Sequence, residues 1–209
     1  MALALPRFYA IIDRSIRPER PLDDIARVLA EAGVRLIQLR AKQATSQVLL
    51  AEARRLLSLL PPDSLLIIND RADVADLAGA AGVHLGQDDL PVAEARALLG
   101  SGKLIGFSTH NPEQLSAADR LGPDYLAFGP IFPTASKASP EPVVGLEGLR
   151  EARRWTTKPL VAIGGITTEN AAAVLEAGAD SVAVIGDWLG ADDMGGRLKE
   201  FRRALGRLN

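Results

Sequence analysis

Residues 34–40 read VRLIQLR, a short and almost continuously apolar run, and residues 45–60 that follow it carry a helical pattern. Within that pattern the apolar residues recur on one helical face, and Pro61 ends the helix. Apolar runs without polar alternation are typical of strands that are covered on both faces of a parallel sheet. A strand followed by a helix is therefore the expected unit of this chain.

The same unit recurs along the sequence. Helical punctuation separates the apolar runs: Pro21 and Gly33 bracket one helix, and Asn111 before Pro112 opens another. Eight strand–helix units in 209 residues predict the α/β class and a single (β/α)₈ TIM barrel domain over residues 1–209. A doubly wound open sheet has the same alternation and is the alternative. The eight apolar runs are 7–13, 34–40, 64–70, 82–87, 103–109, 125–132, 159–166 and 181–186.

The composition favours small-molecule partners. The chain has 24 Lys and Arg against 26 Asp and Glu, and the basic residues are dispersed, so neither nucleic acid nor a membrane is expected as a partner. There is no cysteine, which excludes disulfides and thiolate zinc sites. The first residues have the features of neither a signal peptide nor a membrane span, so a cytoplasmic location is expected. The sequence leaves open whether the chain forms a homo-oligomer.

Basic residues gather at the end of the second apolar run. In either fold, binding residues collect at the carboxyl ends of the strands. Gln38, Arg40 and Lys42 alternate and share one face of that strand, and Lys137 is expected to reach the same space from the loop after the sixth run. Three cations in a partly dry mouth repel one another unless a multiply charged anion binds, which predicts a phosphate or diphosphate site. Solvated loop residues beyond the strand end are the alternative.

Two carboxylates follow the third and fourth runs. Asp70 and Asp89 would lie at neighbouring positions of the mouth, where they must share either a proton or a cation. Mg²⁺ commonly binds through one or two carboxylates and substrate phosphates, so the acid pair and the basic cluster together predict a magnesium–diphosphate site. The alternative is that each Asp caps the helix that follows it.

A glycine pair follows the seventh run. Gly164 and Gly165 would let backbone amides approach a ligand closely, and this barrel architecture often places a phosphate after strands seven and eight. A tight turn ahead of a helix that starts near Thr168 is the alternative.

The chain has two histidines. His84 lies within an apolar strand and is expected to be a structural residue of the core. His110 lies at the mouth, where proton transfer and packing at a helix start are equal alternatives. A Ser108–His110 triad is disfavoured, because residues two apart on one strand do not supply the third, orienting group.

The motifs together resemble those of the thiamine-phosphate synthase family. The matching segments run almost from end to end and in the family's order: QLRAK, INDRADVA, GVHLGQDD, IGFSTH, GPIFPTASK and VAIGGIT. The resemblance implies a (β/α)₈ barrel that joins 4-amino-2-methyl-5-hydroxymethylpyrimidine diphosphate to 4-methyl-5-(2-hydroxyethyl)thiazole phosphate. The products would be thiamine phosphate and pyrophosphate, with Mg²⁺ as cofactor.

The resemblance also implies roles for individual residues. The diphosphate would leave the pyrimidine with dissociative character, and the catalytic residues would be Arg40, Lys42 and Lys137. Asp70 and Asp89 would hold Mg²⁺. The pyrimidine diphosphate would bind to Gln38, Leu39, Arg40, Ala41, Lys42, Asn69, Ser108 and Lys137. The thiazole phosphate would bind to Thr134, Ala135, Ser136, Gly165, Ile185 and Gly186.

The chain departs from the family pattern at two of these positions. Gly186 stands where the family commonly has Ser, and Ser136 stands where it has a second Thr. The first change removes a hydroxyl and the second keeps one, so the affinity for thiazole phosphate is the property at stake.

Two other functions fit parts of the pattern. A thiazole tautomerase of thiamine biosynthesis shares the barrel and uses a histidine at the position of His110. A non-catalytic phosphate-binding barrel would keep the ligand site alone. The magnesium–diphosphate residues favour the synthase, because a tautomerase has no need of them.

Overall fold

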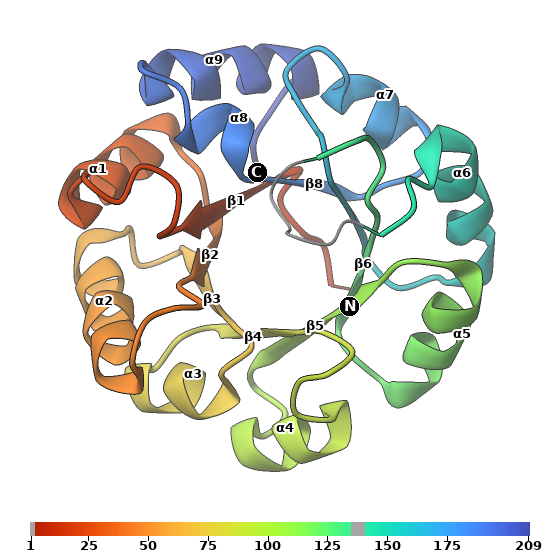
Figure 1. Ribbon diagram of the computed structural model, residues 1–209, viewed down its shortest axis with the longest axis horizontal. Coiled ribbons are helices and arrows are strands. Elements are labelled where there is room, and N and C mark those ends of the chain that lie inside the picture. Colours follow the sequence, from red (N-terminus) through yellow and green to blue (C-terminus); the bar gives the residue numbers. More distant parts are fainter. Residues whose placement is uncertain (1–2, 135–140) are drawn as a thin grey trace.

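The computed structural model describes residues 3–134 and 141–209 and shows a closed barrel of eight parallel strands in sequence order, surrounded by helices (Figure 1). The barrel closes where β1 pairs with β8, with Tyr9 opposite Ala183. The predicted (β/α)₈ barrel is therefore confirmed, and the open-sheet alternative is wrong.

The observed elements match the eight predicted units. The strands are β1 (Phe8–Asp13), β2 (Leu36–Arg40), β3 (Leu65–Asn69), β4 (Gly82–Leu85), β5 (Leu104–Thr109), β6 (Tyr125–Phe128), β7 (Leu160–Ile163) and β8 (Ser181–Val184). The helices in the described ranges are α1 (Leu22–Ala32), α2 (Ser46–Leu59), α3 (Ala72–Ala78), α4 (Val92–Leu99), α5 (Pro112–Leu121), α6 (Gly145–Trp155), α7 (Ala171–Glu176), α8 (Gly186–Leu189) and α9 (Met194–Leu205).

Local signals in the sequence set the helix ends. Gly33 ends α1 with a φ of 74°, a left-handed conformation that costs glycine little. The side chain of Asn111 accepts a hydrogen bond from the backbone N–H of Gln114 at 2.8 Å and so caps α5, with Pro112 in the first turn. The helix boundaries predicted from these residues are confirmed.

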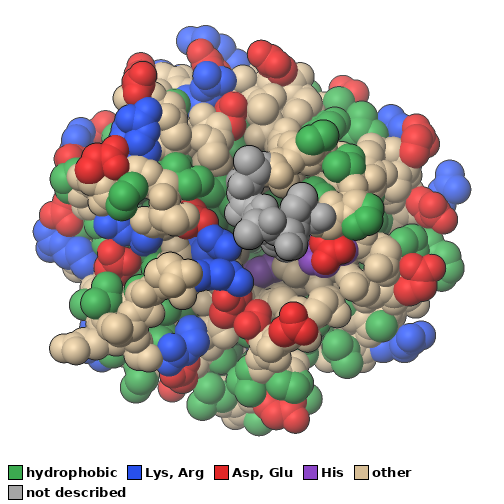
Figure 2. All heavy atoms as spheres, in the orientation of Figure 1, with side chains coloured by type: hydrophobic (Ala, Val, Ile, Leu, Met, Phe, Trp, Pro, Cys, Tyr) green, Lys and Arg blue, Asp and Glu red, His purple; other side chains and the backbone are tan. Residues whose placement is uncertain are grey.

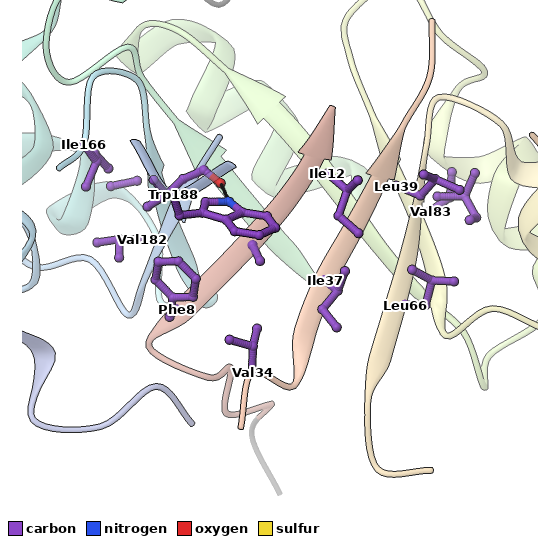
Figure 3. Packing of buried hydrophobic residues seen from close by; sticks show 14 of the residues in the cluster. Phe8, Ile12, Val34, Ile37, Leu39, Leu66, Val83, Ile166, Val182 and Trp188 are labelled. Carbon is purple, nitrogen blue, oxygen red and sulfur yellow. Dashed lines mark hydrogen bonds between the residues drawn. The ribbon is translucent and has the colours of Figure 1, made fainter. Parts of the chain in front are cut away.

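Alternation along the strands divides the core into two layers. Side chains such as Phe8, Ile12 and Ile37 point outward and pack under the helices, where Trp188 donates a hydrogen bond to the carbonyl of Val184 (Figure 3). The intervening residues fill the lumen of the barrel, as Tyr9 does on β1. The lumen cluster consists of Tyr9, Ile11, Leu36, Ile67, Tyr125, Ala127, Val161 and Ala183.

This alternation also places the polar residues of the strand ends. Leu36 faces the lumen, so Gln38 and Arg40 face it as well, one and two steps nearer the mouth. The register puts Ile11 beside Gln38 and Asp13 beside Arg40. The shared face predicted for Gln38 and Arg40 is therefore confirmed. Among the described residues, no helix has the length and hydrophobicity needed to cross a membrane.

Candidate active site

A cavity of about 420 Å³ opens at the carboxyl end of the barrel, and each of the eight strands contributes to its lining. Figure 2 shows basic, acidic and histidine side chains close to one another near the middle of one face of the molecule. The predicted site residues that line the cavity are Gln38, Arg40, Asn69, Ser108, Thr134, Gly165, Ile185 and Gly186. Residues from five separate predicted strands and from the loop after the sixth are thus brought together.

The other predicted residues lie beside the cavity or outside the described chain. Leu39 is buried in the outer core and Ala41 packs against that core, so their side chains point away from the cavity. Lys42 lies at the rim, where its Nζ is 3.4 Å from the carboxylate of Asp70. Ala135, Ser136 and Lys137 lie outside the described residues, and their roles stay predictions.

Arg40 is paired with a carboxylate that the sequence reasoning missed. Its guanidinium forms an ion pair with Asp13, whose side chain is 4% exposed. Asp13 also accepts hydrogen bonds from the backbone N–H and the hydroxyl of Ser15, at 2.9 and 2.7 Å. The expectation of cations that repel one another is therefore wrong for Arg40 and Lys42, because each has its own carboxylate. The signal for Asp13 was its place at the end of the first apolar run.

Asp70 and Asp89 form an adjacent acid pair. Burial and the neighbouring Asp89 raise the pKa of Asp70, and Lys42 opposes the rise. Asp70 has a φ of 64°, an uncommon conformation for a residue other than glycine that Asp tolerates, and such conformations gather at functional sites. Asp89 accepts a hydrogen bond from the backbone N–H of Gly86 at 2.7 Å.

The helix-cap alternative for the two carboxylates is wrong. The residues at the cap positions of α3 and α4 are Arg71 and Pro91, and neither helix has a capping side-chain hydrogen bond. Asp70 instead donates its backbone N–H to the carbonyl of His84, which fixes the end of β3 against β4.

The acid pair is suited to a magnesium ion whose remaining coordination positions are filled by water and by a bound substrate. Within residues 3–134 and 141–209, no group of three or more His, Cys, Asp or Glu side chains could hold a metal by itself. Mg²⁺ prefers oxygen ligands, keeps several waters and commonly takes only one or two carboxylates together with phosphate oxygens. Two adjacent carboxylates, one of them directly after the cavity-lining Asn69, meet that requirement.

A chain of hydrogen bonds crosses the lumen below the cavity. Gln38 Nε2 donates to the hydroxyl of Tyr9 at 2.9 Å, and that hydroxyl lies 2.9 Å from the hydroxyl of Tyr125. His84 Nδ1 lies 3.1 Å from the Tyr125 hydroxyl, and His84 Nε2 lies 2.9 Å from Ser108 Oγ. His84 is buried and both of its ring nitrogens have hydrogen-bond partners, as expected of a structural residue, and it also lines the cavity. Sequence reasoning missed the two tyrosines, because each looks like ordinary core within its apolar run.

His110 lines the cavity and also packs at a helix start. Its ring Nδ1 lies 2.6 Å from the carbonyl of Gly129, and its backbone N–H donates to the side chain of Gln114. Ser108 bonds His84 and not His110, in keeping with the disfavoured triad. The packing alternative for His110 is confirmed, and its use in proton transfer stays a prediction.

The glycine pair is required by close packing. Gly164 and Gly165 have φ values of 101° and 63°. A Cβ atom on Gly164 would lie 2.5 Å from the Cβ of Pro130, so the connection after β6 leaves no room for a side chain. The turn ahead of α7 is confirmed, but α7 begins at Ala171 and not near Thr168.

Asp187 is a carboxylate of the cavity to which the sequence analysis gave no role. It follows Gly186 and lines the cavity. Its buried Oδ2 lies 3.5 Å from Arg197 Nη1 and has no hydrogen-bond partner among the described residues. Burial raises the pKa of Asp187, and the charge of Arg197 opposes the rise. An acidic side chain therefore lies beside the place predicted for a phosphate.

A closed parallel barrel with a cavity at its carboxyl end places the chain among the (β/α)₈ proteins that carry their site on the loops after the strands. The family model described as thiamine monophosphate synthase matches residues 8–187. The chain belongs to that family.

Individual relatives agree with this assignment. The chain is 52% identical to a thiamine-phosphate synthase of Koribacter versatilis over 97% of each sequence. It is 46% identical to a thiamine-phosphate synthase of Albidiferax ferrireducens over 90% of this chain and 86% of that one. The solved structure of a thiamine phosphate pyrophosphorylase from Pyrococcus furiosus has a TM-score of 0.86 and 35% identity, and covers 96% of this chain and 95% of its own.

Proposed function

We propose that the chain is a thiamine-phosphate synthase, a transferase that joins the pyrimidine diphosphate to the thiazole phosphate and releases pyrophosphate. The observation that carries the proposal is that Arg40 lines the cavity while Lys42 pairs with Asp70, which follows the cavity-lining Asn69 and lies next to Asp89. A tautomerase would need neither the acid pair nor the cations, and the relatives described above carry the synthase name.

The proposed reaction asks for electrostatics and positioning. The bond between the pyrimidine methylene carbon and the diphosphate oxygen breaks, and both electrons leave with the diphosphate. The resulting carbon cation is stabilised by the aminopyrimidine and is captured by the lone pair of the thiazole nitrogen. No protein nucleophile takes part, so the chain's task is to hold the leaving group and to exclude water.

The described residues divide this task. Arg40 offers a rigid fork of donors to the diphosphate, and Asp13 fixes one edge of that fork. Lys42 adds a point charge at the rim, and Lys137 would add another by the family resemblance. Asp70 and Asp89 would hold Mg²⁺, which supplies further positive charge to the departing diphosphate when bound.

The proposal is tested by mixing the purified chain with both substrates and Mg²⁺. Thiamine phosphate and pyrophosphate should form in equal amounts, measured by mass spectrometry and by pyrophosphate release. A matched sample with excess EDTA should lose the activity, and added Mg²⁺ should restore it, because two carboxylates alone leave the diphosphate without its counter-charge. Folded protein that makes no product with Mg²⁺ would overturn the proposal, and conversion of a thiazole carboxylate phosphate would then identify a tautomerase.

Asp187→Asn should strengthen binding of the thiazole phosphate. We propose that this phosphate lies near Gly186, where the Asp187 carboxylate would repel it. The KM for the thiazole phosphate should fall about three- to tenfold at pH 8. The pKa of Asp187 is raised, so the carboxylate charges only as the pH rises through that raised value. The ratio of the wild-type to the variant KM should therefore grow with pH and then level off.

The ratio of the two KM values cancels those effects of pH that the wild type and the variant share. Asp192→Asn is the matched control, because Asp192 follows the same strand but its side chain is 93% exposed. A raised native pKa also means that ionised Asp187 lowers the free energy of unfolding as pH rises, so Asp187→Asn should raise the melting temperature at pH 8. An unchanged or higher KM in Asp187→Asn would contradict the repulsion.

A further inference from the structure

The hydrogen-bond chain below the cavity joins two predicted ligand contacts through a residue that no ligand reaches. Gln38 and Ser108 line the cavity, and so do Tyr9 and His84. Tyr125 does not line it and is fully buried. Its hydroxyl nevertheless lies between Tyr9 and His84 and connects the two halves of this hydrogen-bond network.

The donors and acceptors of this chain can be assigned in sequence. Gln38 Nε2 donates to the Tyr9 hydroxyl, so the Tyr9 hydrogen goes to the other partner of that hydroxyl, Tyr125. The Tyr125 hydrogen then goes to His84 Nδ1, which must accept. Burial raises the pKa of both tyrosines, so each hydroxyl keeps a proton to donate.

The assignment continues to both ends of the chain. His84 accepts at Nδ1, so its proton is on Nε2 and is donated to Ser108 Oγ. The Ser108 hydroxyl hydrogen is then directed away from His84. At the other end, Gln38 uses Nε2 for Tyr9 and keeps Oε1 as its acceptor. The cavity therefore presents an acceptor from Gln38 and a donor from Ser108.

The backbone is built to admit this arrangement. The register places His84 beside Gly106 on β5, and Gly106 beside Tyr125 on β6. A Cβ atom on Gly106 would lie 2.1 Å from Tyr125 Cζ and 2.4 Å from His84 Nδ1. The two rings stack across this gap with their centroids 5.5 Å apart. A residue without a side chain between them is what allows the Tyr125–His84 hydrogen bond to form.

We infer that Tyr125 is a positioning residue, which fixes the tautomer of His84 and, through both ends of the chain, the donor and acceptor that the site presents to its ligand. The matching ligand has an amino N–H for Gln38 and an acceptor for Ser108. An amino-substituted nitrogen heterocycle that carries a diphosphate has both. This inference rests on the proposed function for the identity of that substrate, but the tautomer of His84 does not depend on it.

The tautomer is measured first, on the wild-type chain without substrates. The chain has two histidines, so ¹⁵N-histidine labelling gives two imidazole spectra, and His84→Gln assigns them by loss. His84 should carry its proton on Nε2, with Nδ1 unprotonated. The opposite tautomer would mean that the hydrogen bonds are donated in the direction from Ser108 to Gln38, and it would overturn the inference. Tyr125→Phe should convert the single tautomer to a mixture.

Kinetics then separate positioning from general structural damage. In Tyr125→Phe, the KM for the pyrimidine diphosphate should rise about tenfold, the loss expected for one misplaced hydrogen bond, and the KM for the thiazole phosphate should stay within about twofold. Ser181→Ala is the matched control, because Ser181 is a fully buried hydroxyl outside the chain of hydrogen bonds. It should leave both KM values unchanged.

The outcomes distinguish this inference from the proposed function. An equal rise of both KM values in Tyr125→Phe would indicate loosened packing. If the His84 tautomer and both KM values were unchanged in this variant, Tyr125 would not be a positioning residue. Either result would overturn the inference without affecting the proposed synthase activity. A wild-type protein that makes no thiamine phosphate would overturn the proposed function. The His84 tautomer would still test the direction in which the hydrogen bonds are donated.

Discussion

Asp89→Ala should lower the turnover number of thiamine phosphate formation by about 10³-fold, with little change in the fold. Asp89 and Asp70 are adjacent carboxylates beside the cavity, and we propose that they hold Mg²⁺ on the departing diphosphate. Removing one of the two takes away half of the protein's ligands to that ion. Steady-state kinetics at saturating substrates, with increasing Mg²⁺, measure the loss and any partial recovery.

Two matched variants separate charge from loop structure. Asp89 also accepts a hydrogen bond from the Gly86 backbone, and Asp89→Asn keeps an acceptor for that bond but loses the charge. Asp89→Asn should therefore be nearly as slow as Asp89→Ala. Asp88→Ala alters an exposed neighbouring carboxylate and should keep the wild-type rate. Near-normal turnover in Asp89→Ala would remove Asp89 from the proposed metal site.

Arg40→Met should lower kcat/KM for the pyrimidine diphosphate by about 10²- to 10³-fold, because we propose that Arg40 is a bidentate donor to the leaving group. The same change should also destabilise the fold. Asp13 is 4% exposed and would lose its cation, and breaking a buried ion pair from one side costs about 3–5 kcal/mol. Steady-state kinetics and thermal unfolding are measured on the same preparations.

A double variant distinguishes the two effects. Asp13→Asn together with Arg40→Met removes the orphaned charge, so stability should largely return while activity does not. Arg35→Met is the control for a lost Arg–carboxylate pair outside the cavity, since Arg35 precedes β2 and pairs with Asp63 at 2.7 Å. Recovery of activity in the double variant would show that Arg40 acts only by balancing Asp13.

The fold and the mouth of the site could be predicted because both follow from short-range patterns. Apolar runs separated by helical punctuation gave the eight units, and the period of two placed Gln38 and Arg40 in the lumen. Once strand order is sequential, the ends of neighbouring strands must meet at one mouth. The sequence therefore predicts that Asp70 and Asp89 lie near each other, as they do.

The partners of these residues could not be predicted, because they depend on side-chain directions across the barrel. The ion pair between Asp13 and Arg40 requires the register of β1 on β2, which the sequence does not specify. The contact between Tyr9 and Tyr125 joins strands on different sides of the lumen, 116 residues apart in sequence. Asp187 comes directly after Gly186, and the pattern at that strand end does not specify whether its carboxylate faces the cavity or the solvent.

The two layers of the core give this chain separate routes for evolutionary change. On β1, Phe8 and Ile12 pack under the helices, whereas Tyr9 and Ile11 face the lumen. Substitutions at the outward positions should change the melting temperature, and substitutions at the inward positions near the mouth should change which ligand the cavity binds. Adaptation to a new growth temperature and adaptation to a new substrate can therefore proceed on alternate residues of the same strand.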